Sequence, residues 1–292
     1  MSDRDQLIEL VTRRVLTELS GKGVDRCPDC TGGCAAGCAD KVRTVVTAGA
    51  SRVSFNGHGA NVPSDLAGYI DHTLLKPEST RDDVDRICDE AMKYRFAAVC
   101  FNPVWIRRAS EKLKGSGVEI ASVVGFPLGA SAPRIKAAEA RQALRDGASE
   151  IDMVLNVGAL KGRDYDLVRR DVAGVVDACR EVGALCKVIL ETVLLTDEEK
   201  VVASRLAKDA KAHYVKTSTG FGGGGATVYD VALMREAVGA ELGVKASGGI
   251  KTAEDAEQMI AAGATRIGAS AGVRMVASQG NGQTGGTSSE PY

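Results

Sequence analysis

Residues 186–218, CKVILETVLLTDEEKVVASRLAKDAKAHYVKTS, contain two strand-like segments separated by a helical pattern. The segments CKVILETV (186–193) and HYVKTS (213–218) are short and contain several β-branched residues. Two strands joined through a helix are typical of a parallel sheet, because parallel neighbours need a crossover connection. The stretch therefore predicts a β/α unit. It also places Lys216 within a strand, where lysine is uncommon and needs an explanation.

The same alternation extends to both sides of this unit. The other strand candidates, with helical patterns between them, are YIDHTLL (69–75), FAAVCFN (96–102), EIASVVGF (119–126), EIDMVLNV (150–157), GVKAS (243–247) and RIGAS (266–270). Eight β/α units over residues 63–277 predict a (β/α)₈ TIM barrel, a fold that typically takes about 250 residues. An open, doubly wound sheet is the alternative, although no GxGxxG follows the first strand.

The composition narrows the class of protein. The chain has 292 residues, of which 44% are hydrophobic and 26% charged, with a formal net charge of −1. These values predict a globular protein and give no electrostatic argument for nucleic acid as a partner. No apolar run has the length of a membrane span, and charges interrupt the N-terminal segment, unlike a secretory signal. We therefore expect a cytoplasmic protein with no membrane partner.

Two lysines lie at the ends of neighbouring predicted strands. The two-residue period of a strand places Lys216 and Ser218 on one face, and Lys245 and Ser247 on one face. If both faces point into the barrel, two ammonium groups meet in one pocket. A neighbouring cation and loss of water both lower the pKa of a lysine, and a neutral amine can form a Schiff base with a carbonyl. Asp152 could then move protons, directly or through water.

A structural interpretation of the same residues stays open at this point. Lys216 and Lys245 could instead pair with Asp152 and Glu191 in a buried charge network. Glycines after the last two strands, in SGGI (247–250) and GASAG (268–272), allow a similar choice. Their backbone amides could bind a phosphate, as often happens at this place in a barrel, or the glycines could only allow tight turns.

Eight motifs, in order, resemble those of deoxyribose-phosphate aldolase, a family of class I aldolases. They are YIDHTLLKP, VCFNP, VVGFPLGA, EIDMVLNVGALKGRDYDLV, CKVILET, YVKTSTGF, GVKASGGI and RIGASAG, and they run from about residue 63 to 276. The resemblance implies a (β/α)₈ barrel that cleaves 2-deoxy-D-ribose 5-phosphate to D-glyceraldehyde 3-phosphate and acetaldehyde. It implies that no metal or other cofactor is required.

The resemblance also implies roles for individual residues. Lys216 would form the Schiff base, Lys245 would lower its pKa, and Asp152 would shuttle protons with a water molecule. Thr73 would contact the sugar, with Asp71 beside it. The phosphate would be held by Gly220, Gly248, Gly249, Gly268 and Ser270. Some relatives end in a tyrosine that assists proton transfer, so Tyr292 is either a proton relay or an ordinary chain end.

The first 20 residues predict a separate amphipathic helix. Apolar residues recur at helical spacing within residues 3–19, namely Leu7, Ile8, Val11, Val15 and Leu19. The segment resembles an encapsulation peptide, which implies binding to a shell protein and a place in the lumen of a bacterial microcompartment. The alternatives are a helix that docks on its own barrel or at the interface of a homo-oligomer.

Residues 21–62 predict a flexible link that carries four cysteines within CPDCTGGCAAGC. Cys27, Cys30, Cys34 and Cys38 could surround Zn²⁺ or an iron–sulfur cluster, although their spacing matches neither common pattern. Redox-active thiols or disulfides are the alternatives. Residues 278–292 are rich in glycine, serine and threonine and predict a disordered tail.

The sequence therefore favours a deoxyribose-phosphate aldolase carried as microcompartment cargo. Two other hypotheses remain. One is a noncatalytic barrel that binds the shell or a metal. The other is an aldolase-like enzyme that cleaves a different phosphorylated sugar through a Schiff base.

Overall fold

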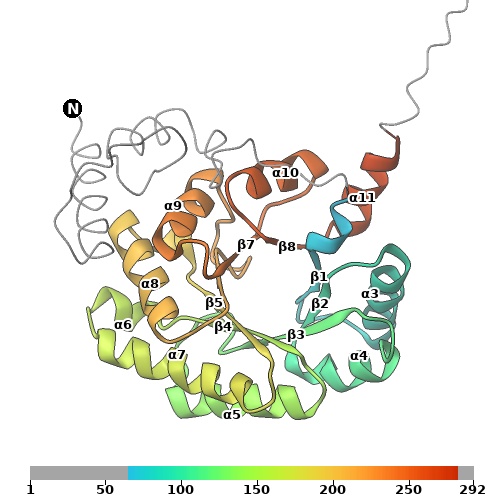
Figure 1. The fold of residues 1–292 in the computed structure, drawn as a ribbon. Coiled ribbons are helices and arrows are strands. Elements are labelled where there is room, and N and C mark those ends of the chain that lie inside the picture. Colours follow the sequence, from blue (N-terminus) through green and yellow to red (C-terminus); the bar gives the residue numbers. More distant parts are fainter. Residues whose placement is uncertain (1–64, 282–292) are drawn as a thin grey trace, which may run out of the picture.

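The computed structural model describes residues 65–281. Within this range the strands pair in chain order, and β8 returns to pair with β1, which closes a barrel (Figure 1). Every strand pair is parallel, as strand–helix–strand connections require. The prediction of a (β/α)₈ barrel is confirmed, and the open doubly wound sheet is wrong. The predicted helix in residues 1–20 lies outside the described residues.

All eight predicted strands are present, most of them shorter than the sequence pattern indicates. They are β1 (Ile70–Leu74), β2 (Ala98–Phe101), β3 (Glu119–Val124), β4 (Glu150–Val154), β5 (Leu185–Ile189), β6 (Tyr214–Lys216), β7 (Gly243–Ser247) and β8 (Arg266–Ala269). The prediction for β6 extends two residues too far, because the strand ends at Lys216, and Thr217 to Thr219 lead from it to the glycine-rich loop.

Helices surround the barrel and connect the strands (Figure 1). The α-helices are α3 (Arg81–Tyr94), α4 (Ile106–Lys112), α5 (Pro133–Arg145), α6 (Val157–Lys161), α7 (Tyr165–Arg180), α8 (Asp197–Asp209), α9 (Val228–Val238), α10 (Ala253–Ala261) and α11 (Gly272–Asn281). Short 3₁₀ helices are η3 (Ala67–Tyr69), η4 (Pro103–Trp105) and η5 (Thr192–Leu194).

Three of the helices begin with the same local device. Thr80, Thr196 and Thr252 each accept a hydrogen bond from the backbone N–H three residues later, and the carboxylate at that later position accepts one in return. This capping box satisfies donors that the first turn of a helix otherwise leaves free. The polar residues at these helix starts therefore determine where α3, α8 and α10 begin.

The alternation of side chains along β4 shows how the barrel separates apolar packing from chemistry. Ile151 and Met153 join the main hydrophobic core, which lies between the strands and the helices. Asp152 lies between them in the sequence, so its side chain points into the barrel. A smaller apolar cluster that includes Cys100 and Ala121 lies on β2 and β3. The barrel interior thus has an apolar part near β2 and β3 and a charged part near β1 and β4 to β8.

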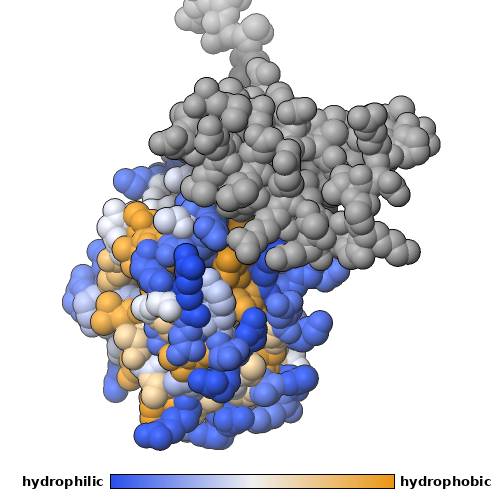
Figure 2. Space-filling view, turned by 90° about the vertical axis from the view of Figure 1, so that its left-hand side faces the viewer, coloured by the Kyte–Doolittle hydropathy of each residue, from blue (hydrophilic) through white to orange (hydrophobic). Residues whose placement is uncertain are grey.

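Hydrophilic residues cover most of the described surface on the side of the barrel that carries α6 and α8 (Figure 2). Hydrophobic residues are scattered between them, which is normal for a protein surface. Among residues 65–281, no helix combines the length and apolar character that crossing a membrane requires.

Candidate active site

Three lysines from neighbouring strands meet at one carboxylate inside the barrel. The Nζ atoms of Lys216 and Lys245 each lie 2.8 Å from Oδ2 of Asp152, and Nζ of Lys187 lies 2.8 Å from Oδ1. The strand register produces this arrangement, because Lys216 lies opposite Lys245 and Asp152 lies opposite Lys187. The sequence predicted that the first two lysines share a pocket, and the structure brings them to the same oxygen atom.

The electrostatics of this cluster favour charged partners around Asp152. Burial alone would raise the pKa of the Asp152 carboxyl, but Lys187, Lys216 and Lys245 together hold it well below its usual value. Burial alone would lower the pKa of Lys245, yet the carboxylates of Asp152 and Asp71 raise it above the ordinary lysine value. The carboxylate is therefore ionised and Lys245 is charged at neutral pH.

The charged network continues below this cluster. Asp71 on β1 forms ion pairs with Lys245 and with Arg266, whose Nη2 lies 2.7 Å from Oδ1. Arg266 also pairs with Glu150 at 3.0 Å, and Glu150 contacts Lys187. Asp71 is completely buried, and its pKa is lowered to about 2, because these cations outweigh the effect of burial. Asp71 does not line the cavity above this network, and its carboxylate contacts Lys245 and Arg266 instead; its expected place beside the substrate stays a prediction.

A cavity of about 690 Å³ opens above this network, at the carboxyl ends of β1, β6, β7 and β8. Lys216 lines the cavity, whereas Lys187, Lys245 and Asp152 do not. Lys216 ends β6 and is 2% exposed, so only the tip of the network reaches the cavity. Of the three lysines around Asp152, Lys216 is thus the one that a small molecule in the cavity can meet.

Most of the residues expected to bind the substrate line the same cavity. They are Thr73, Gly220, Gly248, Gly249, Gly268 and Ser270, and they lie at the carboxyl ends of β1, β6, β7 and β8 or in the loops that follow these strands. Gly248 has a φ of +88°, and a Cβ atom there would lie 3.0 Å from Cα of Gly225. This conformation and the close approach of two loops both favour glycine. The structure therefore brings together residues that are nearly 200 positions apart in the sequence.

Basic side chains at the cavity rim were not predicted from the sequence. Lys76, Lys251 and Arg274 all line the cavity. The guanidinium of Arg274 donates from Nε and Nη2 to the carbonyl of Lys251, at 3.3 and 3.1 Å, which holds it next to the loop after β7. The positions of Lys251 and Arg274, just beyond the SGGI and GASAG motifs, and of Lys76, just after YIDHTLL, are a sequence signal that could have identified them.

Glu191, the other proposed partner of the lysines, lies apart from the charged network. Its carboxylate accepts hydrogen bonds from the backbone N–H and the hydroxyl of Thr219. The structural interpretation of the lysines is therefore right about Asp152 and wrong about Glu191, since the charged network uses Glu150 and Asp71 instead.

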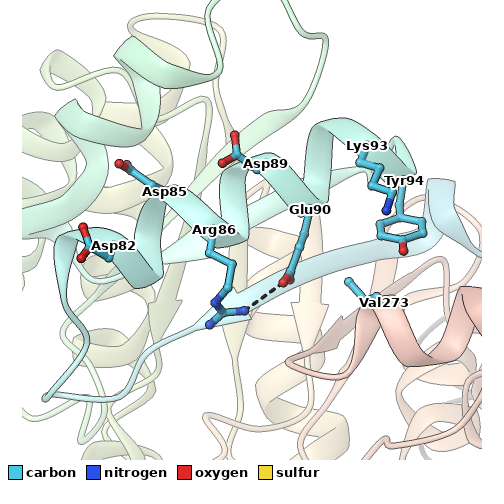
Figure 3. A pocket seen from close by; sticks show the side chains of 8 residues that line it. All are labelled: Asp82, Asp85, Arg86, Asp89, Glu90, Lys93, Tyr94 and Val273. Atoms are coloured by element: carbon cyan, nitrogen blue, oxygen red, sulfur yellow. Dashed lines mark hydrogen bonds and ion pairs between the residues drawn. The ribbon is translucent and has the colours of Figure 1, made fainter.

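A second cavity, of about 480 Å³, lies on the outside of the barrel between α3 and α11 (Figure 3). Arg86 and Glu90 point to the same side of α3 and pair at 2.9 Å. Glu90 also pairs with the buried His72 at 2.6 Å, and Nζ of Lys93 lies 5.1 Å from the ring centre of Tyr94. Arg86, Glu90 and His72 thus pair with one another, and the cavity in the barrel mouth, which Lys216 lines, is the stronger candidate for chemistry.

Several predicted residues lie outside the described range. They are Cys27, Cys30, Cys34 and Cys38, proposed to bind a metal, and Tyr292, proposed to relay protons. Within residues 65–281, no group of three or more His, Cys, Asp or Glu side chains is arranged to hold a metal ion. The metal prediction concerns the earlier cysteines and stays a prediction.

Comparison with known proteins agrees with this geometry. The family model described as "DeoC/LacD family aldolase" matches residues 66–282. A deoxyribose-phosphate aldolase of Thermococcus gammatolerans is 58% identical over 217 residues, which cover 74% of this chain and 96% of the relative. One of Enterococcus faecalis is 58% identical over 212 residues, covering 73% of this chain and 96% of the relative.

A solved structure gives the same result. The deoxyribose phosphate aldolase of Aeropyrum pernix, described as a unique tetramer, superposes with a TM-score of 0.70 at 37% identity. The superposition covers 74% of this chain and 91% of that one. The fold, the lysine cluster under an open cavity and the family match over most of the chain lead to one conclusion: this chain belongs to the DeoC/LacD family of aldolases.

Proposed function

We propose that the enzyme reversibly cleaves 2-deoxy-D-ribose 5-phosphate to D-glyceraldehyde 3-phosphate and acetaldehyde through a Schiff base on Lys216. The observation that carries the proposal is that, of the three lysines around Asp152, only Lys216 lines the cavity. The names of relatives at 56–58% identity supply the substrate.

The charge balance of the cluster explains how Lys216 can become a neutral nucleophile. The network contains four cationic side chains, Lys187, Lys216, Lys245 and Arg266, and three carboxylates, Asp71, Glu150 and Asp152. Loss of a proton from Lys216 leaves three charges of each sign. Asp152 then still accepts hydrogen bonds from Lys187 and Lys245, so no buried carboxylate loses all its partners.

The reaction then follows from ordinary imine chemistry. The neutral amine of Lys216 attacks C1 of the open-chain sugar, and loss of water gives a protonated imine. The imine accepts the electron pair of the C2–C3 bond as that bond breaks, while the C3 hydroxyl loses its proton and becomes the aldehyde of glyceraldehyde 3-phosphate. Protonation of C2 and hydrolysis release acetaldehyde and restore Lys216. Asp152, 2.8 Å from Lys216, is the carboxylate placed to move these protons, directly or through water.

The other side of the cavity suits a phosphate. Backbone amides around Gly248 and Gly249 and the hydroxyl of Ser270 lie among its lining residues, and Lys251 and Arg274 add positive charge at the rim. Arginine is well suited to phosphate because its planar guanidinium can donate two parallel hydrogen bonds. Thr73, on the β1 side of the cavity, is the expected partner of a sugar hydroxyl.

Reductive trapping tests the nucleophile. Acetaldehyde and borohydride added together should leave a two-carbon adduct on the peptide that contains Lys216, identified by mass spectrometry. Lys216→Ala should lose the adduct and the lyase activity. Lys161→Ala, at an exposed lysine that pairs with Glu199 on the outer helices, should keep both. Full lyase activity in the Lys216→Ala protein would overturn the assignment.

A panel of phosphorylated sugars distinguishes this substrate from others. The proposed function requires the highest kcat/KM for 2-deoxy-D-ribose 5-phosphate. A preference for another phosphorylated sugar, with the same adduct on Lys216, would keep the Schiff-base mechanism and reject the substrate. An inactive protein that binds metal tightly would support the noncatalytic alternative.

We also propose that residues 3–19 carry the enzyme into the lumen of a bacterial microcompartment by binding a shell protein. The support is the apolar spacing of this segment and its position before residue 66, where the family match begins. An amphipathic helix can bind in the groove of a partner. Residues 1–20 fused to a fluorescent protein should enter shells in shell-forming cells, and diffuse fluorescence there would count against the proposal.

A further inference from the structure

Glu191 has a strained backbone and a buried carboxylate, and contacts with its surroundings must offset the free-energy cost of both. It follows the carboxyl end of β5 with φ = 57° and ψ = 64°, a left-handed conformation that is unfavourable for glutamate. Its side chain is also buried, at 4% exposure. Such backbone strain persists only where surrounding contacts impose it, and it is concentrated at functional sites. Glu191 does not line the cavity, so a direct contact with the substrate does not explain it.

The contacts of Glu191 lead to the loop that follows β6. Its carboxylate oxygens accept from the backbone N–H of Thr219, at 3.3 and 3.4 Å, and from the hydroxyl of the same residue. The hydroxyl oxygen of Thr219 in turn accepts from the backbone N–H of Phe221 at 3.0 Å. Thr219, Gly220 and Phe221 all line the cavity. One buried carboxylate is therefore linked to Thr219 directly and to Phe221 through the Thr219 hydroxyl, with Gly220 between these two residues of the cavity wall.

The packing of the loop agrees with these hydrogen bonds. A Cβ atom on Gly222 would lie 2.7 Å from Cδ of Glu191, so the glycine allows the loop to rest directly on the carboxylate. The backbone N–H of Thr192 also donates to the carbonyl of Thr217 at 3.0 Å, which joins the two loops at their base. A loop that is rich in glycine has little stiffness of its own, because glycine restricts the backbone least. Its shape must come from such external contacts.

We propose that Glu191 is a positioning residue that fixes the loop from Thr219 to Gly222, and with it the Gly220 amide on the phosphate side of the cavity. This inference rests on the proposed function, in which Gly220 contacts the phosphate of the substrate. Glu191 then acts on the affinity for the phosphate group, whereas Lys216 and Asp152 act on the bond that breaks.

Two variants and one control separate this role from a general loss of structure. Glu191→Ala removes both acceptors, and Glu191→Gln keeps one carbonyl acceptor in a side chain of the same shape. Lys211→Ala is the matched control, because Lys211 also has a left-handed backbone (φ = 65°) but is exposed and lies before β6, at the opposite end of the strand. Circular dichroism and Tm confirm that each protein is folded.

The first readout compares two substrates. Glu191→Ala should raise KM for 2-deoxy-D-ribose 5-phosphate by about tenfold, since the loss of charged hydrogen bonds has effects of this order. Its kcat/KM for unphosphorylated 2-deoxy-D-ribose should stay within about twofold of the wild type. The KM of Glu191→Gln for 2-deoxy-D-ribose 5-phosphate should lie between those of the wild type and Glu191→Ala. The KM of Lys211→Ala should match that of the wild type. An equal loss on both substrates, or no loss on either, would overturn the positioning role.

The second readout needs no catalysis and uses inorganic phosphate as the probe. Calorimetric titration should show phosphate binding to the wild type and to Lys211→Ala, and about tenfold weaker binding to Glu191→Ala. Equal phosphate affinity in the wild type and Glu191→Ala would refute the inference even if the enzyme proves to act on another phosphorylated sugar. Absence of lyase activity in the wild type would instead reject the proposed function, because phosphate binding is measured separately.

Discussion

Replacing Asp152 by asparagine separates the formation of the Schiff base from its turnover. The substitution keeps the size of the side chain but removes the negative charge that three lysines share at 2.8 Å. The buried network then has four cationic side chains and two carboxylates, Asp71 and Glu150. Removing one partner of a buried ion pair costs about 3–5 kcal/mol of folding free energy. A proton-moving group contributes about 10²- to 10⁴-fold to the rate.

We therefore expect Asp152→Asn to lose about 3–5 kcal/mol in urea unfolding and about 10²- to 10⁴-fold in kcat. The excess of positive charge favours a neutral Lys216, so borohydride with acetaldehyde should still label it during a long incubation. Asp230→Asn is the control, because Asp230 pairs with Lys200 on the outer helices at 2.7 Å. It should lose stability and keep kcat. Wild-type kcat in Asp152→Asn, or no labelling of its folded form, would refute the reasoning.

Three further substitutions test the packing and charge of the barrel. Gly268→Ala places a Cβ atom 2.9 Å from Cβ of Ser247 and 3.0 Å from Cε of Lys245. We expect chemical denaturation to show an unfolding free energy that is lower by about 1–3 kcal/mol, and activity assays to show a lower kcat. An unchanged stability and kcat would mean that the barrel relaxes freely around the added methyl group. Gly174→Ala, within α7, meets only Cβ of Ala137 at 3.6 Å; it should raise the unfolding free energy by about 0.5–1 kcal/mol, and a lower Tm would contradict this. Asp71→Asn tests how stability falls at acid pH: because the pKa of Asp71 is about 2 in the fold and about 3.9 in an unfolded chain, its ionised form contributes about 2.6 kcal/mol above pH 4 that is lost as the pH falls towards 2. The stability of Asp71→Asn should lack this pH-dependent contribution. A loss of stability between pH 4 and 2 identical to that of the wild type would exclude it.

The fold could be predicted from the sequence because the signals that determine it are local. Each β/α unit shows its strand as a short apolar run and its helix as an apolar pattern with a 3.6-residue period. Several helices also begin with a capping box in which threonine is the N-cap residue, such as that at Thr196. The ends of the strands were less predictable. Thr217 and Ser218 look like strand residues but lie outside β6, although the backbone N–H of Thr217 still donates to the carbonyl of Lys245 on β7.

The site was predictable where the strand period alone decides which face a side chain takes. Lys216 and Lys245 follow this rule, because each alternates with apolar residues that face the helices. The partners of Asp71 and Glu191 could not be derived in this way. Asp71 pairs with Arg266, 195 positions later, across the closure of the barrel between β1 and β8. Glu191 has a left-handed backbone that no pattern of side chains indicates.

The division of the barrel interior explains why its lysines differ in chemistry although they share one carboxylate. Lys187 contacts the carboxylates of Glu150, Asp152 and Asp71, and Lys245 contacts Asp152 and Asp71, so each cation has at least two anionic partners. Lys216 has an ion pair with Asp152 and otherwise faces the cavity. Among these lysines it therefore has the fewest carboxylate partners. In the proposed mechanism, Lys216 can therefore act as the nucleophile while every carboxylate of the network keeps a cationic partner.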